Sequence, residues 1–358
     1  MKKNVPDILL IYTGGTIGMV KDYKSNALKP FDFENIKVKI PELKLLDCKI
    51  ETTAFSSPID SSDMSPEYWV MIAEIIEKRY DEIDGFVVLT GTDTMSYTAS
   101  AISFILGNLS KPVIFTGSQL PIGDLRTDAK ENLITAIQVA AAQENGVPRI
   151  QEVGLYFEYK LYRANRTTKV SSEQFEAFES PNYPYLGESG VHLNFNDQWL
   201  HKADRSLPLK LEKNLNANVV ILKLFPGINR ELVEHILNFP KLEGVILETY
   251  GAGNALTDSW FSEALKKTSE KEIPVINVTQ CNSGGVLMGH YETSIQLKKA
   301  GVISGRNITT ESAIAKLKLL LGKKIPFKHF KLKLLLGQKI PAKNFRIEFE
   351  TSLRGEMD

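Results

Sequence analysis

Short apolar runs that end in polar or glycine-rich turns recur along the first half of the chain. Ile8–Tyr12 has the length and side chains of a strand that is buried on both faces of a sheet. Further predicted strands are 49–55, 86–89, 112–117 and 153–157. Between them, helical spacing predicts helices over 66–80, around 99–106 and over 129–142. The alternation of strand and helix predicts a parallel sheet with right-handed crossovers.

The second half of the chain repeats this alternation on a smaller scale. Predicted strands are 219–222, 244–247 and 274–278, with helices ending near Leu237 and covering 260–267. The stretch 197–216 is polar and irregular, with Pro208 inside it, which is typical of a linker. We therefore predict an N-terminal α/β domain over 1–196, a linker over 197–216 and a C-terminal α/β domain over 217–358, as the length of 358 residues also favours.

A short repeat lies near the C-terminus. The segment 316–326 recurs as 331–341, and each copy reads Lys-Leu-Lys-Leu-Leu-Leu-Gly followed by a Lys-Ile-Pro ending. The first copy extends an apolar stripe from Ile314 and predicts a core helix capped by Gly322. The second copy is either an added helix or a partly exposed duplication. Two units are too few for a solenoid, and their glycine and proline ends disfavour a membrane-surface helix.

Composition excludes several classes of protein. Lysine plus arginine (43) equals aspartate plus glutamate (43), so no nucleic-acid partner is expected. The apolar runs are too short for a membrane span or a signal peptide. Cys48 and Cys281 are far apart, which favours free thiols and a cytoplasmic protein. The five histidines show no metal-ligand spacing, so neither a metal nor a serine–histidine pair is indicated.

Candidate chemistry begins at the turn Thr13–Gly18, which follows the first predicted strand. Its three glycines leave the Thr16 hydroxyl with little around it, as a nucleophile would need. Taken alone, this segment favours a tight turn without chemistry. A phosphate-binding turn is disfavoured, because the glycine spacing fits neither GxGxxG nor a P-loop. The polar segment 21–26 that follows reads either as a lid or as a plain surface loop.

Three other polar groups follow predicted strands. Asp60, Ser61 and Ser62 lie at a strand-to-helix junction, where they serve either as capping residues or as ligands for a zwitterion. Thr92 and Asp93 precede a helix. They either cap this helix or help it to bind a ligand at its positive, N-terminal end. Lys169 follows a polar loop, where a lysine is usually solvated. It is a functional candidate only in combination with the other polar groups.

Taken together, these motifs are familiar. Along almost its whole length the chain resembles the type I (cytoplasmic) L-asparaginase family. The resemblance rests on Thr13–Ile17, Asp60–Met64, Gly91–Thr94, Asn165–Lys169 and Leu353–Met357, in this order and at family-like spacing. It implies a two-domain asparaginase-like fold, with a larger parallel-sheet domain and a smaller flavodoxin-like C-terminal one. It also implies hydrolysis of L-asparagine to L-aspartate and ammonia, without cofactor, in a homodimer or homotetramer with shared active sites.

The resemblance assigns roles to the candidate residues. Thr16 matches the nucleophile, Thr92 the second catalytic threonine, and Lys169 the lysine that completes a relay with Asp93. The substrate-binding positions are matched by Asp60, Ser61, Ser62, Thr92 and Asp93. For the tyrosine that covers the site, Tyr23 and Tyr291 both match positions used in the family, and we prefer Tyr291.

Physical chemistry supports these roles. A threonine hydroxyl is a poor nucleophile and needs a neighbouring base, which a lysine can be. The substrate's ammonium can pair with Asp93, and its carboxylate with hydroxyls and N–H groups around Ser61. Backbone N–H groups of the Thr16 and Thr92 turns are the expected oxyanion donors. The expected intermediate is a β-aspartyl ester.

Three alternatives remain open at this point. A glutaminase or a mixed asparaginase-glutaminase differs by one methylene in the substrate, which sequence does not resolve. An amidotransferase glutaminase subunit is disfavoured by the absence of a basic patch. A non-catalytic amino-acid-binding or nucleotide-binding module would bind without releasing ammonia. Finally, Cys281 lies where some relatives bind asparagine as an effector, but Glu248 replaces their arginine, so we expect that control to be lost.

Overall fold

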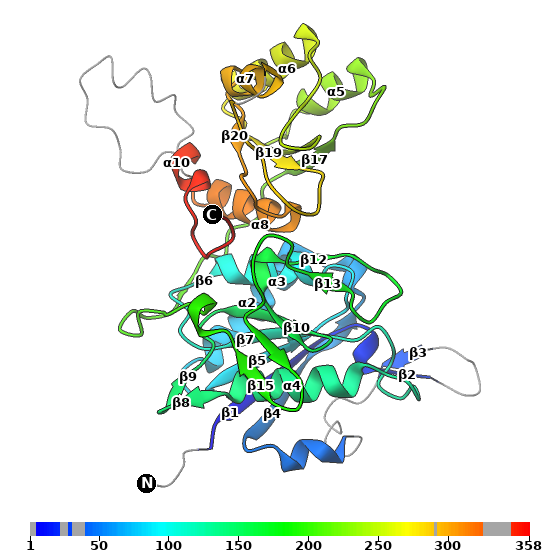
Figure 1. Ribbon diagram of the computed structural model, residues 1–358, viewed down its shortest axis with the longest axis vertical. Helices are drawn as coiled ribbons and strands as arrows, with labels where there is room; N and C mark the ends of the chain where they lie inside the picture. The colour runs from blue at the N-terminus through cyan, green and yellow to red at the C-terminus, as the bar shows by residue number, and fades with distance from the viewer. Residues whose placement is uncertain (1–4, 22–27, 31–39, 290–291, 325–344) are drawn as a thin grey trace. The chain divides into compact units, whose positions relative to one another are not determined.

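The computed structural model describes residues 5–21, 28–30, 40–289, 292–324 and 345–358, and the chain divides into two compact units, 1–212 and 213–358 (Figure 1). The first unit extends beyond the predicted domain to include β16 (Lys210–Leu211), which pairs antiparallel with β6 (Leu106–Gly107). Among the described residues, no helix has the length and apolar character needed to cross a membrane.

An eight-stranded sheet organises the first unit. Its order is β15 (Leu193–Phe195), β14 (Gly187–Ser189), β11 (Lys160–Arg163), β10 (Val153–Phe157), β7 (Val113–Thr116), β5 (Gly85–Leu89), β1 (Asp7–Gly14) and β4 (Lys49–Ile59). The five strands from β10 to β4 are parallel, which confirms the predicted parallel sheet. The strands β11, β14 and β15 continue it in antiparallel fashion, an extension that the sequence did not predict.

The order of the parallel strands creates one special position. The chain runs from β1 to β4 on one side of it, and then returns through α2 (Pro66–Arg79) to β5 on the other side. Connections from β1 and β5 therefore leave the sheet in opposite directions. The position between β1 and β5 is the switch point of the sheet. A crevice opens outside the carboxyl ends of two such strands, and this is where open α/β sheets bind ligands. Thr16 follows β1 and Thr92 follows β5, so both flank this position.

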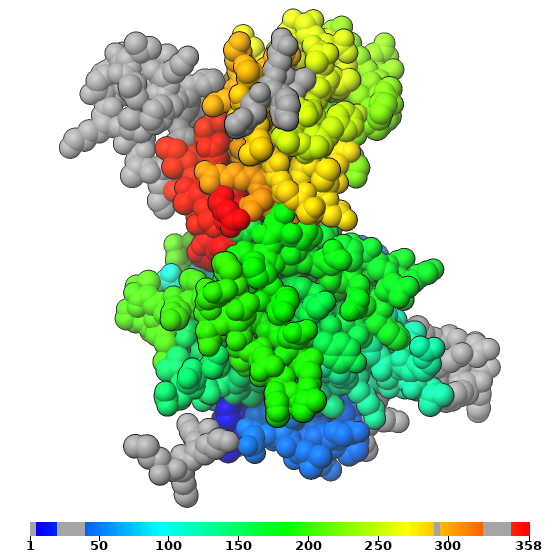
Figure 2. All heavy atoms as spheres, in the orientation of Figure 1, coloured from blue at the N-terminus to red at the C-terminus, as the bar shows by residue number. Residues whose placement is uncertain are grey.

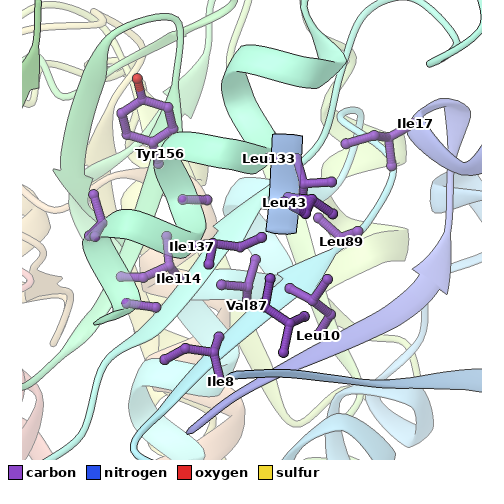
Figure 3. Close-up of a cluster of buried hydrophobic side chains, with 14 of the residues drawn as sticks. Ile8, Leu10, Ile17, Leu43, Val87, Leu89, Ile114, Leu133, Ile137 and Tyr156 are labelled. Atoms are coloured by element: carbon purple, nitrogen blue, oxygen red, sulfur yellow. The ribbon is translucent and has the colours of Figure 1, made fainter. Parts of the chain in front are cut away.

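The helices of the first unit lie close to the predicted ranges, except that the second begins at Met95 rather than near residue 99. Pro66 opens α2 after the N-cap position Ser65, and the buried stripe holds Trp69, Ile72 and Ile76, whereas Ile75 stays partly exposed. Almost every residue of α3 (Met95–Ile105) is buried. Leu133 and Ile137 of α4 (Ala129–Ala141) belong to one hydrophobic cluster with side chains of β1, β5 and β7 (Figure 3).

Shorter elements complete this unit. They are η1 (Thr16–Gly18), β2 (Met19–Lys21), β3 (Leu28–Pro30), η3 (Pro41–Leu45), η4 (Ser61–Asp63), β8 (Gln143–Glu144), β9 (Val147–Pro148), η5 (Ala164–Arg166), β12 (Thr168–Lys169), β13 (Phe178–Glu179) and η6 (Asp197–Trp199). Several of them follow sheet strands, and they carry the candidate site.

The second unit is built on a four-stranded parallel sheet. The strands β17 (Val219–Lys223), β18 (Gly244–Thr249), β19 (Val275–Thr279) and β20 (Ile303–Ser304) lie side by side in chain order. One hydrophobic cluster joins the sheet to α5 (Arg230–Leu237), α6 (Ser259–Glu270) and α7 (Glu292–Lys299). A second cluster joins it to α8 (Thr310–Gly322) and α10 (Phe345–Glu350). Because the strand order follows the chain without reversal, this sheet has no switch point.

The helix α8 contains residues 316–322 of the first copy, so this part is helical as predicted, but the end of the helix differs from the prediction. The C-cap position is Lys323, and Gly322 lies within the helix. A side chain at Gly322 would place its Cβ 1.7 Å from the carbonyl oxygen of Asn214, so glycine is required there by close packing rather than by capping. The second copy, 331–341, lies outside the described residues.

A buried lysine interrupts the apolar stripe of α8. The Lys316 side chain is fully buried, and its Nζ donates to Phe349 O at 2.6 Å, Thr351 O at 2.8 Å and Glu356 Oε1 at 2.5 Å. The carboxylate of Glu356 also accepts from the backbone N–H groups of Leu353 and Arg354. The contacts of Lys316 therefore hold the C-terminal segment against α8.

The turn between β10 and β11 yields a pH-dependent prediction. Burial and the nearby Asp128, Glu131 and Glu176 raise the pKa of Glu158 to about 7. A raised carboxyl pKa means that stability present at acidic pH is lost as the pH rises through that value. The stability of Glu158→Gln relative to the wild type should therefore increase by about 1 kcal/mol as the pH rises from 5 to 8. The increase is modest because the Glu158 side chain is partly exposed to solvent. Urea unfolding of both proteins at pH 5 and pH 8 measures the difference in their free energies of unfolding. An equal difference at the two pH values would contradict this prediction.

Candidate active site

The turns after β1, β4 and β5 meet through backbone contacts that only glycine permits. A Cβ added to Gly14 would lie 2.0 Å from the Ile59 carbonyl oxygen, and one added to Gly15 would lie 2.3 Å from the Gly91 nitrogen. At Gly91, a Cβ would lie 2.5 Å from Ser61 Oγ. Gly14 and Gly15 also have φ angles of 139° and 87°, which side-chain-bearing residues rarely adopt. These contacts bring the three turns together at the switch point.

The Thr16 hydroxyl is not used in holding its turn together. Thr16 is half-buried at the start of η1, and its side chain makes no hydrogen bond with any residue that the structure describes. Its neighbour Thr13 differs, because the buried Thr13 hydroxyl donates to Leu89 O at 3.1 Å. The Tyr12 hydroxyl donates to Gly15 O at 3.4 Å, and burial raises the pKa of Tyr12 to about 12. The turn is therefore held by neutral groups that leave Thr16 available.

Lys169 contacts both residues of the Thr92-Asp93 pair. Its Nζ lies 2.8 Å from Thr92 Oγ1 and 2.6 Å from Asp93 Oδ1. The Lys169 side chain is 17% exposed and that of Asp93 is 67% exposed. Within this ion pair, the lysine is therefore largely shielded from solvent and the aspartate is open to it. Three residues predicted to belong together thus form one connected group.

The segment before Lys169 differs from the polar loop that the sequence indicated. Asn165, Arg166 and Thr167 are all buried, and the Thr167 hydroxyl lies 3.2 Å from Ser96 Oγ of α3. Lys169 then lies in β12, which pairs antiparallel with β13. Packing against α3 before the lysine and pairing with β13 at the lysine hold this segment in place, which explains why Lys169 is not a solvated surface residue.

Asp60 and Ser61 have structural roles at the edge of the site. Asp60 is the N-cap residue of η4, and its carboxylate accepts from Ser62 N at 2.9 Å and Ser62 Oγ at 2.7 Å. These hydrogen bonds lower the pKa of Asp60, so the group stays charged. Ser61 is buried, and its carbonyl accepts from Thr94 Oγ1 at 2.7 Å. The capping interpretation therefore holds for Asp60, beside any role in binding.

Thr92 and Asp93 do not cap the helix that follows them. The N-cap position of α3 is Thr94, and neither neighbouring side chain accepts from the first turn of the helix. The capping alternative considered for this pair is therefore wrong. Both side chains are instead directed to Lys169.

Sequence reasoning missed one residue that contacts this group. Gln119 follows β7, the next parallel strand, and the Thr92 hydroxyl donates to Gln119 Oε1 at 3.2 Å. The sequence showed Gln119 only as part of a connection. Its place after the carboxyl end of a parallel strand, which it shares with Thr16 and Thr92, is the signal that could have identified it.

Several remaining candidates lie elsewhere or outside the described residues. Tyr23 and Tyr291 both fall outside them. In the second unit, Cys281 is exposed, while Glu248 accepts from Thr310 Oγ1 at 2.7 Å and pairs with Lys223 at 3.4 Å. The described residues contain no cluster of potential metal ligands.

Comparison with known proteins identifies the family. Residues 7–201 match the family model "Asparaginase, N-terminal", and residues 218–332 match "Glutaminase/Asparaginase C-terminal domain". L-asparaginase 1 of Escherichia coli K12 is 41% identical over 323 residues, which cover 89% of this chain and 92% of that protein.

Solved structures agree with this result. L-asparaginase I from Vibrio cholerae has a TM-score of 0.84 at 37% identity, covering 99% of both chains. The thermostable L-asparaginase from Thermococcus kodakarensis has a TM-score of 0.83 at 31% identity, covering 98% of this chain and 99% of that one. The chain therefore belongs to the asparaginase family of amidohydrolases.

Proposed function

We propose that this protein is an L-asparaginase, which hydrolyses L-asparagine to L-aspartate and ammonia through an acyl-enzyme on Thr16. One observation carries the proposal: Lys169 contacts Thr92 and Asp93, and the turn that carries these two residues meets the Thr16 turn at the switch point of the sheet. A free hydroxyl, a proton-exchanging lysine and a carboxylate are the groups that amide hydrolysis by covalent catalysis needs.

The first half of the reaction forms the acyl-enzyme. Thr16 Oγ1 attacks the side-chain amide carbon of asparagine, and backbone N–H groups of the Thr16 and Thr92 turns stabilise the developing oxyanion. The carbon–nitrogen bond then breaks, and the hydroxyl proton of Thr16 leaves with the nitrogen as ammonia. A β-aspartyl ester on Thr16 remains.

The second half hydrolyses this ester. A water molecule attacks the ester carbon, one water proton returns to Thr16 Oγ1, and aspartate is released. In this step Thr92 orients the water, and the hydrogen bond from Lys169 supports this role because it leaves a second lone pair on the Thr92 oxygen. Lys169, held by Asp93, supplies positive charge and exchanges a proton during the two halves of the reaction.

Charged groups around the site suit a zwitterionic substrate. Asp60, held by the Ser62 hydroxyl, and Asp93 can hold the ammonium group, and the hydroxyl and N–H groups around Ser61 can hold the carboxylate. Following the family resemblance, we assign Tyr291 to the cover of the site, and we expect a homodimer or homotetramer in the cytoplasm that needs no cofactor.

A coupled ammonia assay with asparagine and with glutamine tests the proposal. We expect ammonia and aspartate in equal amounts from asparagine, and much slower release from glutamine. Faster release from glutamine would assign the protein as a glutaminase instead. Tight binding of asparagine without ammonia release would show a non-catalytic binding module.

A further inference from the structure

Gln119 is held in place by a buried carboxylate next to the site. Its backbone N–H donates to Asp128 Oδ2 at 2.9 Å, and the N–H of Leu120 donates to Asp128 Oδ1 at 3.1 Å. Asp128 is buried and also accepts from Asn132 Nδ2 at 3.2 Å. The Gln119 side chain therefore extends from a backbone that is fixed on both sides.

The partners of Gln119 determine which way its amide points. Nε2 donates to the carbonyl oxygen of Gln174 at 3.1 Å, and a carbonyl can only accept, so the NH₂ end faces Gln174. The amide oxygen then faces Thr92. Because that oxygen also only accepts, the Thr92 hydroxyl must donate to it.

This fixes the direction of both hydrogen bonds that the Thr92 hydroxyl makes with the described residues. The hydroxyl proton is directed to Gln119, one lone pair of Oγ1 accepts from Lys169 Nζ, and the second lone pair stays available. A hydroxyl that donates elsewhere presents only lone pairs to an attacking water. Without the Gln119 acceptor, the Thr92 O–H bond would be free to rotate into the site.

We propose that Gln119 is a positioning residue, which keeps the Thr92 hydroxyl in the orientation that accepts a hydrogen bond from the water that hydrolyses the acyl-enzyme. This inference rests on the proposed function and goes beyond it, because it assigns Gln119 to one half of the reaction. In the first turnover, loss of Gln119 should slow release of aspartate more than release of ammonia.

The test is Gln119→Met, which keeps the side-chain length and removes the acceptor. We expect kcat for asparagine to fall about 5- to 10-fold, as for a lost hydrogen bond of roughly 1 kcal/mol. KM should fall by a similar factor, so that kcat/KM changes by less than about 2-fold, because acylation is unaffected while the acyl-enzyme accumulates. Rapid-quench measurements should show a burst of ammonia before a slower steady state, because the acyl-enzyme accumulates. Gln174→Ala is the matched control: it alters an exposed glutamine but keeps the carbonyl acceptor, so its kcat should match the wild type.

The outcomes separate this inference from the proposed function. A wild-type protein that releases no ammonia from asparagine would remove the proposed function and this inference with it. An active wild type with unchanged kcat in Gln119→Met would overturn only the role of Gln119. A raised KM with unchanged kcat would do the same, since it would make Gln119 a substrate-binding residue.

The repeat near the C-terminus carries a second, independent inference. Residues 316–330 read KLKLLLGKKIPFKHF and residues 331–345 read KLKLLLGQKIPAKNF, so two consecutive units of fifteen residues differ at only three positions. The first residue of the first unit is the buried Lys316. The last residue of the second unit is the buried Phe345, which begins α10.

We infer that one unit of fifteen residues is an insertion that the fold does not require. Deleting 331–345 leaves Lys316 in α8 and places Phe330 directly before Arg346, where Phe345 stood. The shortened chain thus keeps a phenylalanine at the start of α10 and the lysine that α10 and Glu356 surround.

The deletion itself is the test. We expect the variant without 331–345 to be soluble and to release ammonia from asparagine within about 2-fold of the full chain. Its melting temperature should stay within a few degrees of the full chain, because the contacts of Lys316 with Phe349 and Glu356 remain. An insoluble or inactive variant, or a clearly lower melting temperature, would show that the fold uses both units.

Discussion

Replacing Thr16 by valine should lower kcat for asparagine by at least about 10³-fold, the scale on which loss of a nucleophile acts in covalent catalysis. Valine has the shape of threonine without the hydroxyl. Since the Thr16 hydroxyl makes no hydrogen bond with any described residue, its loss should leave the turn intact. Ammonia release under saturating asparagine measures the effect, and the melting temperature should stay within a few degrees of the wild type.

Two comparisons make this prediction specific. Thr16→Ser keeps a hydroxyl at the same position and should retain far more activity than Thr16→Val. Rapid acid quenching during turnover, followed by peptide mass spectrometry, should locate an aspartyl ester on the peptide that carries Thr16. Ordinary turnover in Thr16→Val, or an ester on the peptide that carries Thr92, would assign the nucleophile to a different residue.

Replacing Lys316 by methionine should be among the most destabilising single changes in this protein, costing about 3–5 kcal/mol. The destabilisation comes from the buried groups that lose their hydrogen-bonding partner. Glu356 would keep a buried charge without its partner, and the carbonyl groups of Phe349 and Thr351 would each lose a donor. A fall in melting temperature on the order of 10 °C for the transition of the second unit measures the effect.

The electrostatics of the pair explain the size of this effect. Burial alone would raise the pKa of Glu356, but Lys316 and two backbone N–H groups outweigh it, so its pKa is lowered and the group is charged at neutral pH. Burial lowers the pKa of Lys316 in spite of the attraction of Glu356. Each charge is therefore held in the interior mainly by the other, and removing one leaves the second exposed to the full cost of burial.

The repeat offers a matched control. Lys331 occupies the same place in an identical stretch of seven residues, so Lys331→Met makes the same chemical change in the same local sequence. We expect Lys331→Met to melt with the wild type. Equal loss of stability in both variants would mean that the buried contact is not specific to Lys316.

The sequence by itself determined the local elements and the identity of most site residues. The run Ile8–Tyr12 is apolar at every position because β1 is covered on both faces, and Pro66 after Ser65 marks the start of α2, since proline suits a first helical position. Glycine patterns also marked the turns, because conformations such as those of Gly14 and Gly15 exclude other residues. These features depend on a residue and its near neighbours, so they can be read from the chain.

The tertiary structure alone decided which distant residues meet. The contact of Lys169 with Thr92 spans 77 positions, and that of Thr92 with Gln119 spans 27. The family resemblance led us to expect the first contact, whereas the second was not predicted. The same holds for Lys316, which the pattern placed on a helix and whose burial depends on Glu356, 40 residues away. Hydrophobic periodicity reports whether a side chain is buried, whereas its partner is fixed by strand order and by packing of the whole chain.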